Sequence, residues 1–165
     1  MSEDVKKRAG FFRRLAAMVY DGLIAVAIGM LSALVIIGVL TALFAQGIIP
    51  NQGFEHFNEF IQQSVIYTLI VQIWVLIWVS VFFLWFWKHG GQTLGMRAWR
   101  IRIFNLREND EVGYKRLFIR LISSLCGLGT LLVLIDFKNK LALQDRLTQT
   151  EVLVLSKEEN HHRAW

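Results

Sequence analysis

Two long apolar stretches limit what this chain can fold into. Residues 15–45 contain one charged side chain, Asp21, and residues 61–87 contain none. A helix needs about 20 apolar residues to cross the hydrocarbon core of a bilayer, so both stretches are long enough. The sequence therefore predicts an all-α membrane protein with transmembrane helices over residues 13–45 and 61–88.

Basic residues ahead of an apolar stretch also occur in cleavable signal peptides. The first stretch is longer than the apolar part of a signal peptide, carries an acid and lacks a convincing cleavage site, so we expect a retained helix. The single cysteine, Cys126, cannot form an internal disulfide, and nothing in the sequence indicates an oxidising compartment.

Lys and Arg residues indicate the orientation of the two helices. These residues are frequent before the first helix and after the second, whereas residues 46–60 have none. By the positive-inside rule, residues 1–12 and the tail 137–165 are cytoplasmic and the loop 46–60 is external. The formal net charge of +5 is mostly this topology signal, so we do not expect nucleic-acid binding.

The pattern of residues 89–116 is typical of a strand and a turn rather than of a membrane helix. Gly90 and Gly91 end the second helix, and residues 99–104 then alternate with a period of two. Turn residues follow at Asn109, Asp110 and Gly113. Residues 150–155 alternate in the same way, so we expect the two segments to pair as a small cytoplasmic β-ribbon.

A third apolar element is expected over residues 117–136. Its apolar part is shorter than a span and is weakened in the middle by small and polar residues, namely Ser123, Ser124, Gly127, Gly129 and Thr130. A re-entrant or interfacial pair of half-helices would return the tail to the cytoplasm, since irregular backbone is tolerated at membrane depth where protein buries it. A third crossing is the alternative.

Asp21 is unusual because it is a charged residue within an apolar membrane helix. A carboxylate at the bilayer centre costs about 2.5–3.5 kcal/mol on insertion scales, unless a base, water or a proton compensates it. Arg14 shares its helical face, about 10.5 Å away, which is too far for a tight ion pair between them. Small residues that allow close helix packing run up the same helix at Gly22, Ala25, Gly29 and Ala33, so we expect Asp21 to face protein.

Three segments together resemble the signature blocks of the RDD family of bacterial membrane proteins. They are RRLAAMVYD at 13–21, GGQTLGMRAWRIRIF at 90–104 and NKLALQDRLTQTEVLVL at 139–155. The resemblance implies that the arginine and two aspartates for which the family is named are Arg14, Asp21 and Asp145, with Arg13 as the alternative arginine. Supporting block residues are Gly91, Gly95, Arg146 and Thr150. Met96 and Arg97 stand where the family often has a Lys.

The resemblance implies a multi-pass protein of the bacterial cytoplasmic (inner) membrane. For some members it implies exchange of Na⁺, Li⁺ or K⁺ for protons. Asp21 would then be the exchange site, and Arg14 would tune Asp21 or bind Asp145. Two transmembrane helices are too few to enclose an ion pathway, so transport would require a homo-oligomer whose subunit interface lines the pathway.

A structural role for the same residues is the second interpretation. Arg14 would pair with Asp145, and Asp21 with Arg120 or Arg146, which would clamp the ribbon and the third element against the first helix. A non-transporting adaptor is the alternative function, with the basic residues 97–120 docking a partner protein or anionic lipid. The sequence contains no motif of an enzyme, and we expect no cofactor and no metal site.

Overall fold

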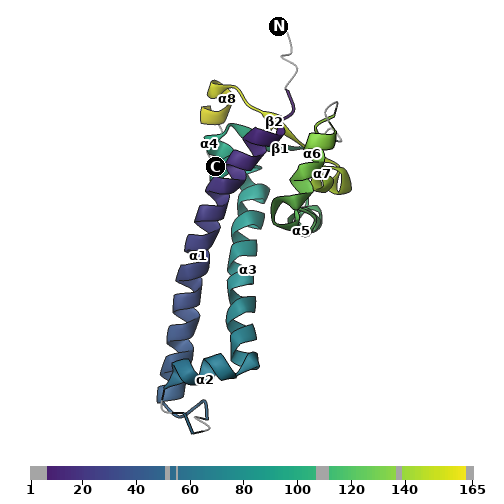
Figure 1. Ribbon diagram of the computed structural model, residues 1–165. Helices are drawn as coiled ribbons and strands as arrows, with labels where there is room; N and C mark the ends of the chain where they lie inside the picture. Colours follow the sequence, from purple (N-terminus) through teal and green to yellow (C-terminus); the bar gives the residue numbers. More distant parts are fainter. Residues whose placement is uncertain (1–6, 51–52, 55, 107–111, 137–138, 163–165) are drawn as a thin grey trace. The chain divides into compact units, whose positions relative to one another are not determined.

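The computed structural model describes residues 7–50, 53–54, 56–106, 112–136 and 139–162. Two helices, α1 (Phe11–Ala45) and α3 (Val65–Gly90), are long and apolar enough to cross a membrane (Figure 1). The two long apolar helices predicted from the sequence are therefore confirmed. The first begins at Phe11 rather than at residue 13, and a separate short helix, α2 (Phe57–Gln63), takes the place of the expected start of the second. Ser64, which separates α2 from α3, has an extended backbone.

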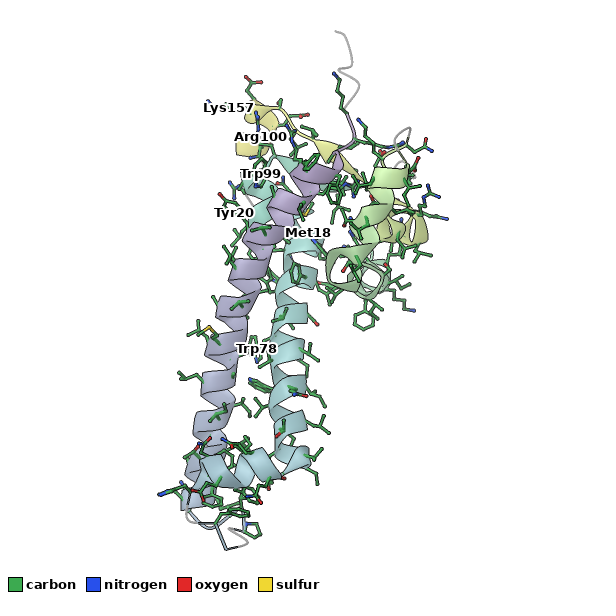
Figure 2. The ribbon with its side chains drawn as sticks, viewed as in Figure 1. Met18, Tyr20, Trp78, Trp99, Arg100 and Lys157 are labelled. Carbon is green, nitrogen blue, oxygen red and sulfur yellow. The ribbon has the colours of Figure 1, made fainter. Side chains whose placement is uncertain are left out.

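The chain forms two compact units. Unit 2 is Ile24–Val81, and unit 1 combines Met1–Leu23 with Phe82–Trp165. In unit 2, aromatic and aliphatic side chains gather around four buried residues, Leu40, Ile49, Phe57 and Phe60. About half of the other side chains of α1 and α3 in this unit are exposed and apolar, as lipid contact requires, and Figure 2 shows side chains projecting from both helices.

Within unit 2, α1 and α3 touch through a small residue and an indole. A Cβ placed on Gly29 would lie 3.4 Å from Cγ1 of Val75, so this glycine brings the helices close. The indole N–H of Trp74 donates to the carbonyl of Ser32 over 3.1 Å. This satisfies the indole donor, which would otherwise lack a partner in an apolar medium.

Unit 1 contains the predicted ribbon. The strands β1 (Ile101–Asn105) and β2 (Thr150–Val154) pair antiparallel, with Ile101 opposite Val154. The ribbon gains a third segment that the sequence pattern did not indicate. The N–H of Ala9 donates to the carbonyl of Val152 over 2.8 Å, and Lys7 accepts from the N–H of Val154 over 2.9 Å.

Short helices complete unit 1. They are α4 (Leu94–Ala98), α5 (Tyr114–Ser123), the 3₁₀ turn η1 (Leu125–Leu131), α6 (Leu132–Ile135), α7 (Leu143–Thr148) and α8 (Lys157–His162). The third apolar element is the pair Tyr114–Ser123 and Gly127–Ile135, which is bent by 82°. The break lies at the small and polar residues singled out in the sequence. By length and composition the pair is either a broken span or a re-entrant loop.

The expected segment boundaries differ from the helices and strands in two places. The ribbon and linker segment 89–116 also contains α4 and the start of α5, while the tail 137–165 contains α7, β2 and α8. Of the predicted turn residues, Asn109 and Asp110 lie outside the described residues, and Gly113 is the N-cap of α5.

Candidate functional site

One face of α1 is buried where the helix begins. Arg14, Ala17 and Asp21 are 4%, 1% and 5% exposed, and their spacing of three and four residues places them on one side of the helix. Their neighbours Leu15, Val19 and Tyr20 are exposed. The prediction that Asp21 faces protein is therefore confirmed.

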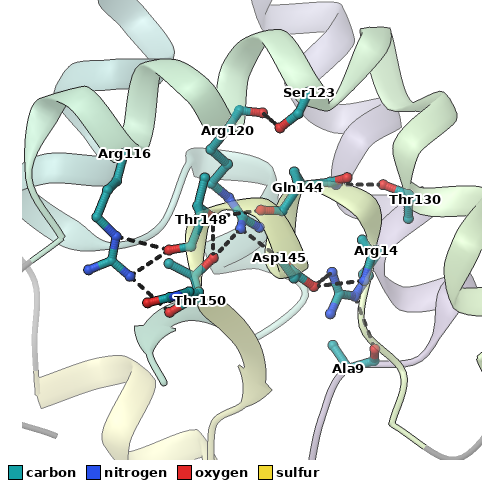
Figure 3. Close-up of polar contacts among 12 residues, drawn as sticks. Ala9, Arg14, Arg116, Arg120, Ser123, Thr130, Gln144, Asp145, Thr148 and Thr150 are labelled. Carbon is teal, nitrogen blue, oxygen red and sulfur yellow. Dashed lines mark hydrogen bonds and ion pairs between the residues drawn. The ribbon is translucent and has the colours of Figure 1, made fainter. Parts of the chain in front are cut away.

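Asp145, at the start of α7, lies between two arginines (Figure 3). Its Oδ2 is 2.6 Å from Nη1 of Arg14, and its Oδ1 is 2.7 Å from Nη1 of Arg120. The backbone N–H of Ala142 donates to Oδ2 over 3.1 Å. The Arg120 contact is an ion pair without hydrogen-bond geometry at Oδ1. The aspartate side chain is 0% exposed, so all of its partners are protein groups.

Two buried arginines against one aspartate leave one positive charge in excess, and neutral groups solvate it. Arg14 donates from Nε to the carbonyl of Ala9 and from Nη2 to that of Lys140, each over 3.1 Å. The guanidinium of Arg120 lies 5.8 Å from the ring centre of Trp87, within the range of a cation–π contact. We call Arg14, Arg120 and Asp145 the ion cluster.

A chain of hydroxyl groups connects the ion cluster to α7 and the ribbon. Arg120 donates to Oγ1 of Thr150 over 2.6 Å, and the Thr150 and Thr148 hydroxyl oxygens are 2.8 Å apart. The Thr148 hydroxyl donates to the carbonyl of Gln144 over 2.6 Å, which leaves Thr150 as the donor to Thr148. This gives Thr150 of the last signature block a defined role as the acceptor for Arg120.

The pKa of Asp145 is lower than its ordinary value. Burial acts to raise this pKa, but the charges of Arg120 and Arg14 and the Ala142 N–H outweigh burial. Asp145 therefore stays ionised in the folded protein. A carboxylate held in this way keeps a fixed charge and is poorly suited to exchanging protons.

Asp21 has different partners. The Thr93 hydroxyl donates to its Oδ2, and the Gly95 N–H donates to its Oδ1 over 2.8 Å. Within the described part of the chain, Asp21 forms no ion pair. The expected pairing of Asp21 with Arg120 or Arg146 is therefore wrong, because Arg120 binds Asp145 and Arg146 binds Asp136. Asp21 is a buried carboxylate with neutral donors.

The second signature block is built to receive Asp21. Thr93 is the N-cap of α4, and its oxygen accepts from the Met96 N–H over 3.3 Å while its hydroxyl donates to Asp21. Gly95 allows α4 to approach α1, because a Cβ there would lie 2.2 Å from the carbonyl oxygen of Ala17. Gly91 has φ +65°, a conformation that favours glycine, and its carbonyl accepts from the Ile103 N–H over 2.9 Å.

The remaining predicted residues lie outside these contacts. Arg13 is half-buried and has no ion pair within the described residues, so Arg14 is the arginine of the site. Arg146 pairs with Asp136 at 2.7 Å, and the arginine side chain is half-exposed. The Asn139 N–H, followed by Arg146, lowers the pKa of Asp136.

The four small residues of α1 do not act together. Gly29 contacts α3, and Ala25 and Ala33 are partly buried. Gly22 is exposed, and a Cβ there would meet nothing within 4 Å, so no helix of the described part of the chain packs against it, and its predicted role in helix packing stays a prediction. Helix α4 lies on the neighbouring face of α1, over Ala17 and Asp21.

Sequence reasoning missed several residues of the site. Thr93 lies within the second signature block, and the sequence indicates no partner for its hydroxyl. Arg116 belongs to the basic stretch 97–120 that the adaptor hypothesis assigns to docking, yet its Nε donates to the carbonyl of Thr148 over 2.9 Å and its Nη2 to Oδ1 of Asn105 over 2.9 Å. Arg116 is four residues before Arg120, so the two share one face of α5, and this spacing could have indicated that both arginines face protein. Among the described residues, no cluster of three or more His, Cys, Asp or Glu side chains could hold a metal ion.

Comparison with protein-family models gives a match over most of the chain. The family model described as RDD family matches residues 8–149, which include Arg14, Asp21, Arg120 and Asp145. No curated protein and no solved structure matches the chain.

Proposed function

The chain belongs to the RDD family of membrane proteins, and on this basis we propose that it exchanges a monovalent cation for protons, with Asp21 as the exchanging carboxylate. In this proposal the protein lies in the bacterial inner membrane as a homo-oligomer with its N-terminus in the cytoplasm. Exchange is the activity that the family resemblance implies for some members.

The partners of Asp21 are the observation that carries the proposal. Its two oxygens receive hydrogen bonds from a hydroxyl and a backbone N–H, and within the described residues no cationic side chain neutralises it. A proton and a monovalent cation each neutralise a carboxylate, so binding of one excludes the other. Ionisable residues within transmembrane helices commonly mark ion pathways and proton relays.

The ion cluster has the complementary role of support. Asp145 is neutralised by Arg14 and Arg120, so it does not compete with Asp21 for cations. The cluster also fixes the start of α1 against α7 and α5. Arg14 and Asp21 lie on one face of α1, so the exchange carboxylate stands on a rigidly held helix end.

The adaptor hypothesis loses part of its basis. It requires the basic residues 97–120 to face a partner, but Arg120 is 4% exposed and binds Asp145. Arg116 is engaged by the carbonyl groups of Thr148 and Gln149. These two arginines stabilise the fold of unit 1 and are not available for docking.

Flux measurements on purified protein in proteoliposomes test the proposal. A pulse of Na⁺, Li⁺ or K⁺ is expected to move protons, read with a pH-sensitive dye, and Asp21→Asn is expected to abolish this flux. Asn keeps the shape of Asp and can still accept from the Gly95 N–H, so the fold, checked by circular dichroism, is expected to persist.

The matched control is Asp136→Asn, which removes a carboxylate whose ion-pair partner, Arg146, is exposed to solvent, and it is expected to leave the flux unchanged. A folded Asp21→Asn protein with wild-type flux would remove Asp21 as the exchange site. A wild-type protein that moves no protons with any of the three cations would overturn the exchange function.

A further inference from the structure

Helix α5 has the reverse of the polarity expected at a water-facing surface. Its buried side carries Arg120, Ser123 and Leu117. Its outer side carries large apolar residues that are between 48% and 59% exposed, namely Tyr114, Phe118, Ile119 and Ile122. A surface helix in water directs its apolar face to the core and its charges outward. The outer side of α5 is therefore suited to an apolar medium.

The same polarity continues beyond the bend. Thr130 and Val133 are buried, and Thr130 accepts from the amide of Gln144 over 3.0 Å. The outward side chains are again large and apolar: Leu128, Leu131, Leu134 and Ile135. We call the exposed apolar residues of α5 and of 127–135 the apolar face.

Two contacts relate α5 to the end of α3. The Lys88 ammonium lies 5.9 Å from the ring centre of Tyr114, and the Arg120 guanidinium lies 5.8 Å from that of Trp87. Trp87 and Lys88 end an apolar membrane helix, where aromatic and basic side chains mark the headgroup region. The contacts therefore place α5 at the depth of the membrane interface.

The spacing of these contacts indicates that α5 crosses the end of α3 that belongs to unit 1. Trp87 and Lys88 are neighbours, about 1.5 Å apart along α3, whereas Tyr114 and Arg120 are about 9 Å apart along α5. A helix that crosses a spanning helix lies close to the membrane plane.

We propose that the bent pair is a lipid-facing wedge that lies within one leaflet and does not cross the bilayer. Its apolar face contacts acyl chains, while its opposite face supplies Arg120 to the ion cluster. Helix α5 has 10 residues, so it is about 15 Å long, half of the hydrocarbon thickness. Lys115, in its first turn, is long enough to reach the headgroups.

Depth measurements on the full-length protein in proteoliposomes test the wedge. Single cysteines are introduced into a Cys126→Ala protein at Phe118, Ile122, Leu131 and Ile135, and each is spin-labelled. These positions are exposed, so the labels do not disturb packing. The ratio of oxygen to nickel-chelate accessibility gives the depth of each label. Arg100, exposed in unit 1, serves as the aqueous reference, and Leu76, near the middle of α3, serves as the deep reference.

All four labels are expected to be shallower than Leu76, deeper than Arg100 and in the same leaflet. A depth that passes the bilayer centre, with Ile135 at the opposite headgroups, would show a third crossing and overturn the wedge. Four labels as accessible to the nickel chelate as Arg100 would also overturn it, and would indicate a surface for a protein partner. The readout does not depend on ion exchange, so its outcome is separate from that of the proposed function.

Discussion

Replacing Asp145 by Asn is expected to lower the free energy of unfolding by about 3–5 kcal/mol, because the change leaves two buried arginines without a counter-charge. Both arginine side chains are 5% exposed, so water cannot take the place of the carboxylate. Unfolding of the purified protein in mixed micelles, followed by tryptophan fluorescence, measures the loss. Asp136→Asn is the control, because its partner Arg146 is exposed, and little change is expected.

The stability that the ion cluster contributes is also expected to depend on pH in one direction. The pKa of Asp145 is depressed in the folded state, so the stability from the ion cluster is present above the unfolded pKa of about 3.9 and is lost as the pH falls through the lower folded pKa. The difference between wild type and Asp145→Asn should therefore be constant from pH 7 to pH 5 and shrink only in stronger acid. A difference that disappears near neutral pH would contradict a fixed charge at Asp145.

Gly95→Ala is expected to lower the free energy of unfolding by about 3 kcal/mol. The new methyl group would lie 2.2 Å from the Ala17 carbonyl oxygen and 2.8 Å from Oδ1 of Asp21. The carbonyl belongs to the helix backbone, so α4 must move away from α1, and the hydrogen bond from the Gly95 N–H to Asp21 is lost with it.

Gly22→Ala is the matched control for this substitution. It adds the same methyl group to the same unit, but at a position with nothing within 4 Å, and Ala has the higher helix propensity by about 1 kcal/mol. We expect unchanged or slightly higher stability, measured in the same unfolding experiment. Equal losses in the two variants would contradict the close approach of α4 to α1.

The features that the sequence predicted well have strong, local patterns. The apolar length of α1 and α3 and the alternation around Ile101 and Val152 are visible without knowledge of distant contacts. The pairing of Arg14 with Asp145 was predicted by the structural interpretation of the three residues that the family resemblance implies. These elements are confirmed.

The partner of Asp21 was predicted wrongly for a physical reason. Sequence reasoning sought a cationic partner, because an ion pair is the common way to bury a carboxylate. The chain instead uses the hydroxyl of Thr93 and the N–H of Gly95, and backbone donors leave no signal in composition. The two arginines expected to compete for Asp21 are bound elsewhere, one of them inside the ion cluster.

The pairing of residues 7–9 with β2 could not be predicted from the sequence pattern either. A single bridge between Arg8 and Leu153 is too short to show a period of two. Two backbone hydrogen bonds and the ion pair of Arg8 with Glu151, at 2.7 Å, hold residues 7–9 against β2. These partners are more than a hundred residues apart in the sequence. Such contacts depend on the tertiary structure that places the segments together.

A pair of double-mutant cycles tests most directly that the two aspartates of the site have separate roles. Unfolding free energies are measured for Arg14→Gln with Asp145→Asn, and for Arg14→Gln with Asp21→Asn, each with its single variants. We predict a coupling of about 3 kcal/mol between Arg14 and Asp145, and of less than about 0.5 kcal/mol between Arg14 and Asp21, which lie about two helical turns apart. A strong coupling of Arg14 to Asp21, with none to Asp145, would contradict the account.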